Sequence, residues 1–166
     1  MQRRLLLRSA IRNSARNALL CALLLLPQAS AAALGTPVFE WQRCPASYCE
    51  TGWYASPAVS DVDGDGGVEV LWGGYTLLSV RGDTGVIEWD YAPESGAGRM
   101  WPGVAVADLD GDGAREVVVV QNREIAVLDA AGVIQPGWPQ NVFGSSEMRT
   151  LAVADLDRDG AFEILV

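Results

Sequence analysis

The sequence repeats one acidic segment three times: DVDGDGGVE at residues 61–69, DLDGDGARE at 108–116 and DLDRDGAFE at 155–163. Successive copies start 47 residues apart, at Asp61, Asp108 and Asp155. Each copy carries aspartate at its first, third and fifth positions, glycine at its sixth and glutamate at its ninth. A period kept to the residue over three copies indicates a structural unit that is used repeatedly, so this repeat decides the architecture.

The spacing of the acids predicts a site for a hard divalent cation in each copy. Ca²⁺ takes about six to eight oxygen ligands from carboxylates, carbonyls and water. Aspartates at alternate positions of a tight loop can turn inward together, and glycine at the sixth position allows a sharp turn where a Cβ would be costly. The side chain at the seventh position varies, so we expect its backbone carbonyl to be the ligand there. The predicted ligands are Asp61, Asp63, Asp65, Gly67, Glu69, Asp108, Asp110, Asp112, Ala114, Glu116, Asp155, Asp157, Asp159, Ala161 and Glu163.

Two other interpretations of the acidic segments fit the sequence less well. Aspartate and glycine are common in solvated turns, but two unit charges about 4 Å apart repel by roughly 4 kcal/mol at an effective dielectric of about 20. Four carboxylates on one small loop therefore oppose its folding unless a cation lies among them. An EF-hand needs glutamate at its twelfth position and helices on both sides. The twelfth residues here are Trp72, Val119 and Val166, with strand-like flanks, so an EF-hand is rejected.

Residues 1–33 have the features of a cleavable secretory signal. Five of the twelve arginines lie within the first 16 residues, ahead of nine apolar residues at 18–26 and a small-residue segment at 29–33. This order is typical of an export signal, and a transmembrane helix would need about 20 apolar residues. We therefore predict cleavage after Ala31 or Ala33, a periplasmic, cell-surface or extracellular location, and no membrane insertion of the mature chain.

The chain beyond the signal is strongly acidic. Seven arginines face 21 acidic residues there, which gives a net charge of −14, and the whole sequence contains neither lysine nor histidine. This charge argues against nucleic acid and against anionic lipid as partners. The expected partner is instead a protein or a carbohydrate.

Two cysteines, Cys44 and Cys49, remain after removal of the signal. Their short separation in an exported chain predicts a disulfide that closes a local loop. A zinc site is the weaker alternative, because two thiolates without histidine leave such a site incomplete.

Short β-rich segments surround each acidic loop. They lie at 56–60, 68–72, 76–80 and 86–90 in the first unit, at 103–107, 115–120, 124–128 and 133–138 in the second, and at 150–154 and 162–166 in the third. Four short antiparallel strands in about 45 residues are typical of one propeller blade. We therefore predict an all-β fold, an incomplete β-propeller of about two and a half repeats with units near 56–102, 103–149 and 150–166. Residues 34–55 are expected to form the cysteine-bridged loop and an N-terminal strand at 37–41, which resembles the fourth strand of a unit.

From Trp53 to Val166 the units resemble the FG-GAP/VCBS-type calcium-binding repeats of integrin α-subunit β-propellers and many bacterial exported proteins. The acidic loop is the most specific part of this resemblance. It implies that the Asp triplets, the seventh-position carbonyls and the ninth-position acids bind about three Ca²⁺. The ninth acid is Glu where integrin-type loops usually carry Asp, and the Phe-Gly opening of the repeat is replaced. These departures leave the cation site intact but do not support integrin-like ligand recognition.

The expected function is an exported calcium-binding propeller module for protein or carbohydrate interaction or adhesion, with Ca²⁺ as a structural staple. The alternative is the N-terminal part of a calcium-dependent, polysaccharide lyase-like propeller enzyme. No catalytic constellation is visible, because histidine and lysine are absent and the clustered carboxylates are the proposed ligands. Open strand edges at the ends of an incomplete propeller would favour self-association.

Two further motifs have both a structural and a functional interpretation. Arg81-Gly82-Asp83 spells an adhesion tripeptide, but the next unit carries DAAG at 129–132 in the same place, so we interpret it as a turn. Trp53, Tyr54 and Trp101 precede the first strands of their units, where they either pack in the core or stack on sugar rings.

Overall fold

The computed structural model describes residues 35–44, 49, 54–93, 98–142 and 147–166. The chain divides into two units, Met1–Phe39 and Glu40–Val166. The predicted signal at residues 1–33 lies outside the described residues. Within the described ranges, no helix has the length and apolar character needed to span a membrane.

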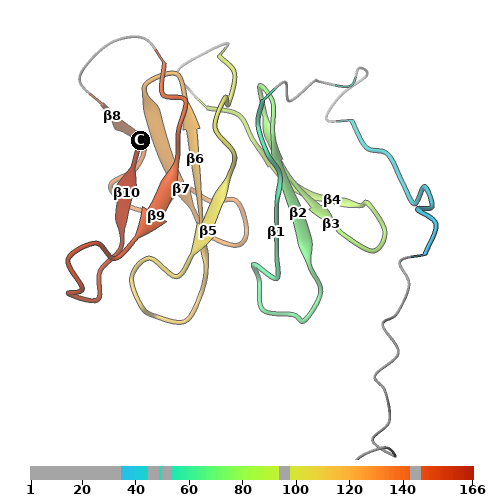
Figure 1. The fold of residues 1–166 in the computed structure, drawn as a ribbon, viewed down its shortest axis with the longest axis horizontal. Coiled ribbons are helices and arrows are strands. Elements are labelled where there is room, and N and C mark those ends of the chain that lie inside the picture. The colour runs from blue at the N-terminus through green and yellow to red at the C-terminus, as the bar shows by residue number, and fades with distance from the viewer. Residues whose placement is uncertain (1–34, 45–48, 50–53, 94–97, 143–146) are drawn as a thin grey trace, which may run out of the picture. The chain divides into compact units, whose positions relative to one another are not determined.

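Three antiparallel sheets make up the second unit (Figure 1). The first sheet has the order β1 (Ala58–Ser60), β2 (Glu69–Gly73), β3 (Leu77–Arg81) and β4 (Ile87–Tyr91). The second has the order β5 (Ala105–Ala107), β6 (Glu116–Gln121), β7 (Glu124–Leu128) and β8 (Gln140–Asn141). The third pairs β9 (Ala152–Ala154) with β10 (Glu163–Leu165). The prediction of an all-β fold built from partial propeller blades is confirmed.

Two predicted strands are not formed, although the structure describes their residues. Residues 133–138 form no strand: Ile134 makes a single bridge with Leu128, and the fourth strand of the second sheet is β8 instead. Pro136 has no N–H to donate to a ladder, and Gly137 has a φ of 89°, so the chain turns before β8. The expected strand at 37–41 is also not formed.

The acidic loops connect the first and second strands of the three sheets in one shared register. The residue before each loop pairs with the ninth-position glutamate: Ser60 with Glu69, Ala107 with Glu116, and Ala154 with Glu163. The first strands β1, β5 and β9 lie side by side, and the three loops project at the same end of these strands (Figure 1). Each loop is therefore held at both ends by a strand ladder.

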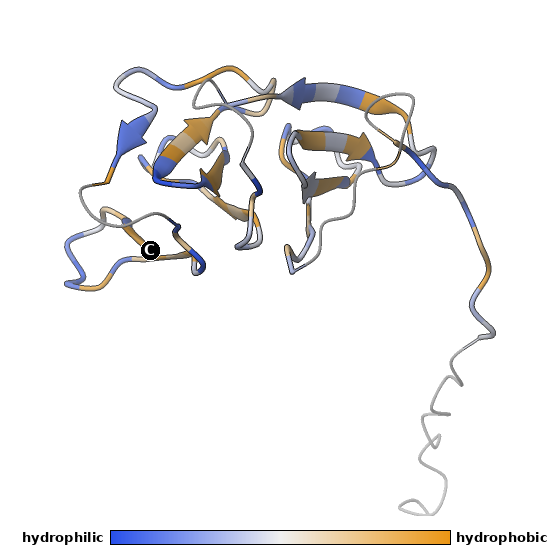
Figure 2. Ribbon diagram, turned by 90° about the horizontal axis from the view of Figure 1, so that it is seen from above, coloured by the Kyte–Doolittle hydropathy of each residue, from blue (hydrophilic) through white to orange (hydrophobic). Residues whose placement is uncertain are grey.

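Two hydrophobic clusters fill the space between neighbouring sheets. The cluster between the first and second sheets includes Leu71, Leu77, Val117, Val119 and Leu128, all buried. The cluster between the second and third sheets is centred on Val118, Val120, Ile125 and Val127. β6 and β7 are buried along their whole length, which explains their unbroken apolar and β-branched runs. Figure 2 shows hydrophobic stretches on several of the strands.

Candidate metal centre

Each acidic loop folds around its own first aspartate. Asp61 accepts hydrogen bonds from the N–H groups of Gly64, at 2.8 Å, and Gly66, at 3.2 Å. Asp108 accepts the equivalent bonds from Gly111 and Gly113, at 2.8 and 3.0 Å. The sixth-position glycine has a φ of 89° in the first loop and 94° in the other two. The sharp turn expected at this position is therefore present, in a backbone conformation that only glycine adopts at low cost.

The structure brings three carboxylates of every loop together. One oxygen from each of three side chains lies within 4.8 Å of the other two, at the first, third and ninth positions of the loop. The three groups are Asp61, Asp63 and Glu69; Asp108, Asp110 and Glu116; and Asp155, Asp157 and Glu163. Carboxylates this close repel one another unless a cation lies among them. The clusters are therefore suited to a divalent ion.

The fifth-position aspartates lie outside these groups. Each accepts the N–H of its seventh residue: Asp65 from Gly67 at 2.6 Å, Asp112 from Ala114 at 2.7 Å, and Asp159 from Ala161 at 2.9 Å. This bond holds the fifth side chain against the backbone of the loop. A ligand role for these aspartates, and for the seventh-position carbonyls, stays a prediction.

Burial of the ninth-position glutamate is the observation that best fits a bound cation. Glu69 is 2 % exposed, and its Oε2 accepts the N–H of Val62 at 2.7 Å. Its other oxygen, Oε1, is buried without a hydrogen-bond partner. Burying a charged oxygen without a partner is costly, and native structures nearly always pair such groups. A cation that coordinates Oε1 would remove this cost. The donor set of carboxylate oxygens matches a hard cation such as Ca²⁺.

Without a bound ion, the surroundings of Glu69 and Glu116 disfavour the charged form of both carboxylates. Burial raises the pKa of Glu69, and the charges of Asp63, Glu88 and Asp65 raise it further, against a lowering by the Val62 N–H. Burial and the three loop aspartates likewise raise the pKa of Glu116, whose Oε2 accepts the N–H of Leu109 at 2.8 Å. A bound divalent cation reverses this balance and favours the charged form.

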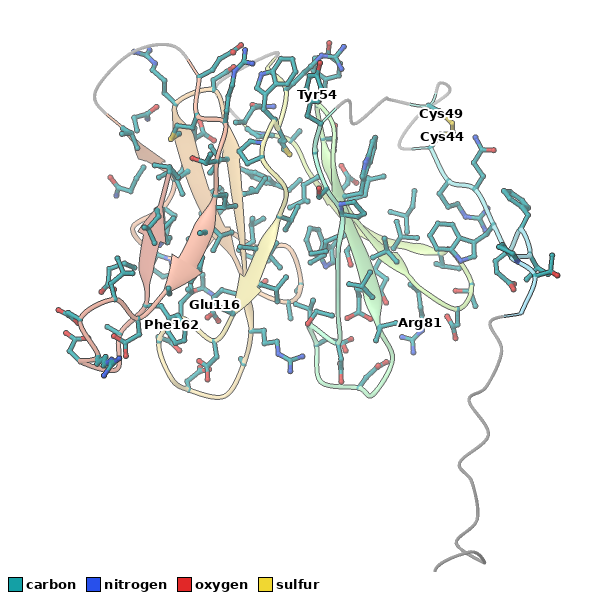
Figure 3. All side chains as sticks on the ribbon, viewed as in Figure 1. Cys44, Cys49, Tyr54, Arg81, Glu116 and Phe162 are labelled. Carbon is teal, nitrogen blue, oxygen red and sulfur yellow. A yellow bond between two sulfur atoms is a disulfide. The ribbon has the colours of Figure 1, made fainter. Side chains whose placement is uncertain are left out.

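Arg81 is a site residue that the sequence analysis missed. Its guanidinium lies 2.8 Å from Asp65 and 3.6 Å from both Asp83 and Glu88, at the end of β3 nearest the first loop (Figure 3). The hydrogen bond from Arg81, followed by the one from the Gly67 N–H, lowers the pKa of Asp65. The guanidinium of Arg81 thus supplies a positive charge to the first loop.

The presence of Arg81 also explains why the seventh residue of the first loop is glycine. A Cβ at Gly67 would lie 2.8 Å from Nη2 of Arg81 and 2.9 Å from Oδ1 of Asp65. The other loops have alanine at this position, and the residue 47 positions after Arg81 is the buried Leu128. The sequence carries a trace of this contact, since glycine and arginine occupy these two positions in the first unit where alanine and leucine occupy them in the second.

The Arg81-Gly82-Asp83 tripeptide lies in the β3–β4 turn. The N–H of Gly85 donates to the carbonyl of Arg81 at 2.8 Å, and the carbonyl of Gly82 accepts the indole N–H of Trp41 at 2.9 Å. These contacts support the interpretation of the tripeptide as a structural turn.

Two other groups of predicted residues are placed by the structure. Cys44 and Cys49 are joined by a disulfide (Figure 3). The rings of Tyr54 and Trp101 stack with their centroids 5.8 Å apart, and the guanidinium of Arg149 lies 5.0 Å from the Trp101 ring centroid. Tyr54 is 72 % exposed, so this stack lies at the surface. Trp53 lies outside the described residues.

Comparison with known proteins identifies the repeat. Residues 108–166, which contain the second and third loops, match the FG-GAP-like repeat family. The structure is similar to the crystal structure of the V. cholerae biofilm matrix protein Bap1, with a TM-score of 0.56 and 26% sequence identity. That match covers 76% of this chain and 24% of the other, so the chain spans about a quarter of that protein's length. No curated protein sequence matches the chain significantly.

Proposed function

We propose that this chain is an exported, calcium-stapled propeller module that mediates adhesion by binding a protein or a carbohydrate, and that it is not itself an enzyme. The buried, unpaired Oε1 of Glu69 carries the calcium part of the proposal, because Glu69 belongs to a group of three close carboxylates that recurs in every loop. The similarity to a biofilm matrix protein supports the adhesive part, and together with the disulfide it supports an extracytoplasmic location.

The position of each loop favours a structural role for the ion. Every loop joins the first strand of its sheet to the second, and its glutamate is the first residue of that second strand. A cation bound there ties the two strands together at one end of the sheet. Extracellular calcium modules bind with dissociation constants of about 10⁻⁴–10⁻³ M, and a ligand at about 100 times its dissociation constant adds roughly 2.7 kcal/mol of stability.

Thermal unfolding of the mature chain in millimolar Ca²⁺, in Mg²⁺ and in EGTA tests the staple. We expect the midpoint to fall on chelation and to be restored by Ca²⁺, and calorimetry to count about three ions. Asp110→Asn, at the third position of the middle loop, should weaken one of the sites and leave the other two unchanged. An unchanged midpoint, or fewer than two bound ions, would contradict the proposal.

The inventory of side chains supports a role without catalysis. The chain contains no histidine or lysine, the commonest proton-transfer groups other than carboxylates and tyrosine, and twelve of its acids lie in the three loops. Incubation with acidic polysaccharides, followed both for binding and for depolymerisation, separates adhesion from catalysis. We expect retention without cleavage; turnover by the purified chain would overturn this part of the proposal.

A further inference from the structure

Aromatic and arginine side chains gather at the end of the sheets that lies opposite the acidic loops. Tyr54 and Trp101 stand 47 residues apart, each four residues ahead of the first strand of its sheet, β1 or β5. Their rings stack with centroids 5.8 Å apart. Arg149, shortly before β9, continues this row, because its guanidinium carbon lies 5.0 Å from the Trp101 ring centroid. Three successive units thus supply one member each to a single row, and Figure 3 labels Tyr54 at this end and Glu116 at the other.

A second arginine lies on a second aromatic ring at the same end. The guanidinium carbon of Arg99 is 4.6 Å from the ring centroid of Tyr75, which belongs to the turn between β2 and β3. The backbone beneath this pair is held by Gln121, which is 2 % exposed and donates to the carbonyls of Tyr75, at 3.1 Å, and Gly98, at 2.6 Å. Side chains positioned in this way by a rigid framework lose little conformational freedom when a ligand binds.

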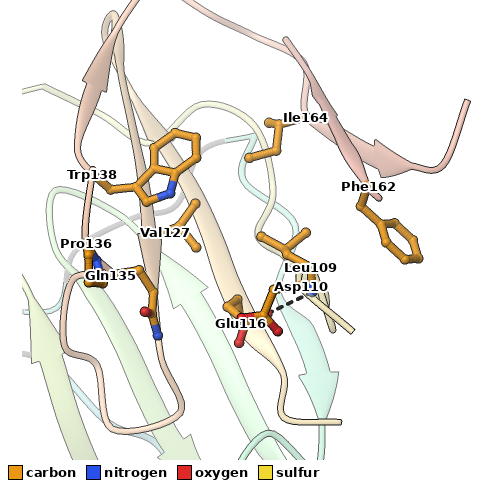
Figure 4. A pocket seen from close by; sticks show the side chains of 9 residues that line it. All are labelled: Leu109, Asp110, Glu116, Val127, Gln135, Pro136, Trp138, Phe162 and Ile164. Atoms are coloured by element: carbon orange, nitrogen blue, oxygen red, sulfur yellow. Dashed lines mark hydrogen bonds between the residues drawn. The ribbon is translucent and has the colours of Figure 1, made fainter. Parts of the chain in front are cut away.

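The charges of the chain differ between the two ends of the sheets. At the loop end, a cavity of about 250 Å³ is lined by the carboxylates of Asp110 and Glu116 (Figure 4), which would repel an anion. The opposite end carries Arg99, Arg149 and, in the turn between β6 and β7, Arg123. Strands of five or six residues separate the two ends by roughly 15–20 Å, about twice the screening length of ~8 Å at physiological ionic strength. An anion at the arginine end is therefore attracted by the near charges more than it is repelled by the distant loops.

The carboxylate of Glu147 shows what the row can bind. Its Oε2 accepts hydrogen bonds from both Nη2 and Nε of Arg149, at 2.6 and 3.2 Å. The guanidinium thus pairs with a carboxylate through one edge while its carbon stays over the Trp101 ring, an arrangement that arginine allows and lysine does not. Both side chains are accessible, at 64 % and 35 % exposure. A carboxylate from a ligand can therefore take the place of Glu147.

We propose that this end of the sheets is a binding site for an acidic polysaccharide. Carboxylates of uronic acid units would pair with Arg149 and Arg99, and the apolar faces of the sugar rings would lie against Tyr54, which is 72 % exposed, and the accessible part of Trp101. Tyrosine, tryptophan and arginine are the residue types enriched at the energetic centres of binding surfaces. A row built from successive units also suits a polymer with regularly spaced charges. The inference deepens the adhesive function proposed above, and rests on it.

Calorimetric titration of the mature chain in millimolar Ca²⁺ tests the inference. The probe is a hexasaccharide of hyaluronan, which carries a carboxylate on every second sugar, and the comparison is chitohexaose, which is uncharged. We expect saturable binding of the acidic hexasaccharide that weakens as salt is raised, and weaker binding of the neutral one.

Four substitutions test the recognition itself. Glu147→Gln removes the competing carboxylate and should raise the affinity about twofold or more. Arg149→Lys keeps the charge but loses the paired donors and the contact with the ring, and should lower the affinity about threefold or more. Arg123→Lys, the same exchange in an exposed turn at the same end, should leave it unchanged. Tyr54→Ala, at a surface position, should lower it about threefold without lowering the melting temperature.

The outcomes separate this inference from the proposed function. Saturable binding that survives both Arg149→Lys and Tyr54→Ala unchanged would overturn the site but leave adhesion to carbohydrate standing. Absence of saturable binding of the acidic hexasaccharide would overturn the inference and leave a protein as the expected ligand of the module. Tighter binding of chitohexaose, equal losses in Arg149→Lys and Arg123→Lys, or no gain in Glu147→Gln would each overturn the assignment to an acidic ligand.

Discussion

The first and second acidic loops have the same spacing of acids but different surroundings. In both loops the ninth-position glutamate is buried, and its Oε2 accepts the N–H of the loop's second residue. Within the part of the chain that the structure describes, an arginine binds the fifth-position aspartate in the first loop, where Arg81 lies 2.8 Å from Asp65, and not in the second. In the second unit the position equivalent to Arg81 is Leu128, which is buried in the core.

The difference shows that the negative charge of one and the same motif can be offset either by an arginine of the protein or by a bound ion. Arg81 offsets part of the negative charge of the first loop within the protein, and it engages the aspartate that the spacing assigns to the cation. The second loop has no such partner among its described contacts and depends more on an ion. We therefore expect the second loop to bind Ca²⁺ more tightly than the first, although their acids are identical.

Replacement of the buried glutamate should give the largest effect. Glu69→Gln keeps an acceptor for the Val62 N–H but removes a charge that is buried and unpaired. We expect the metal-free protein to gain about 1–3 kcal/mol of unfolding free energy, the usual cost of an unsatisfied buried polar group. In Ca²⁺ the same variant should lose affinity at the first loop by at least about tenfold, equivalent to roughly 1.4 kcal/mol.

Melting curves with and without EGTA check this reversal of sign. The control is Glu147→Gln, which removes the same charge from an exposed residue that pairs with Arg149 and belongs to none of the three acidic loops. A variant at Glu69 that destabilises the protein equally in both conditions would show that the glutamate has only a packing role.

Removal of Arg81 should make the first loop resemble the second. With Arg81→Gln, Asp65 loses the contact that lowers its pKa and becomes available to the ion. We expect the affinity of the first loop for Ca²⁺ to rise by about two- to fivefold, in keeping with the modest strength of exposed ion pairs. Arg123→Gln, which removes the same charge from an exposed turn, is the control. Equal changes in both variants would reduce the role of Arg81 to net charge alone.

Gly67→Ala tests the same contact from the other side. A methyl group at this position displaces the Arg81 guanidinium, the flexible end of a side chain, and gives the first loop the residue of the other two. We expect a rise in affinity similar to that of Arg81→Gln, and little further change in the double variant, because both substitutions break one interaction. Calorimetric titration of the two single variants and the double variant measures this coupling. Additive effects would mean that Gly67 and Arg81 act independently.

The parts of this site that could be predicted are local in sequence. The glycine turn and the grouping of the first, third and ninth acids depend on nine consecutive residues, and the flanking strands are short and rich in β-branched residues. The pairing of Arg81 with Asp65 crosses from β3 back to the loop before β2, and the hydrogen bond from the Trp41 indole to the Gly82 carbonyl joins residues 41 positions apart. Such contacts are set by tertiary packing, which no local pattern encodes. The strand expected at 133–138 failed for the opposite reason, since Pro136 overrides an apolar pattern locally.

The smallest expected effect concerns communication between the two loops. Arg115, at the eighth position of the second loop, donates to the carbonyl of Asp61 and to the hydroxyl of Ser60, the latter at 3.3 Å. The third loop has Phe162 at this position, which offers no such donor to the second loop. Arg115 therefore links the second loop to the backbone of Asp61, the first residue of the first loop. Filling one site should favour the other through this contact.

Arg115→Gln should remove this coupling without removing a predicted ligand. We expect the affinity for the second Ca²⁺, divided by the affinity for the first, to fall about twofold from its value in the unchanged chain. The effect is small because the Arg115 side chain is exposed and such contacts are weak. Phe162→Gln, the equivalent position of the third loop, should leave the relation between the first two sites unchanged. Stepwise titration, with Asp157→Asn used to silence the third site, isolates the pair. If the two affinities keep their ratio after Arg115→Gln, the loops bind their ions independently and differ only through Arg81.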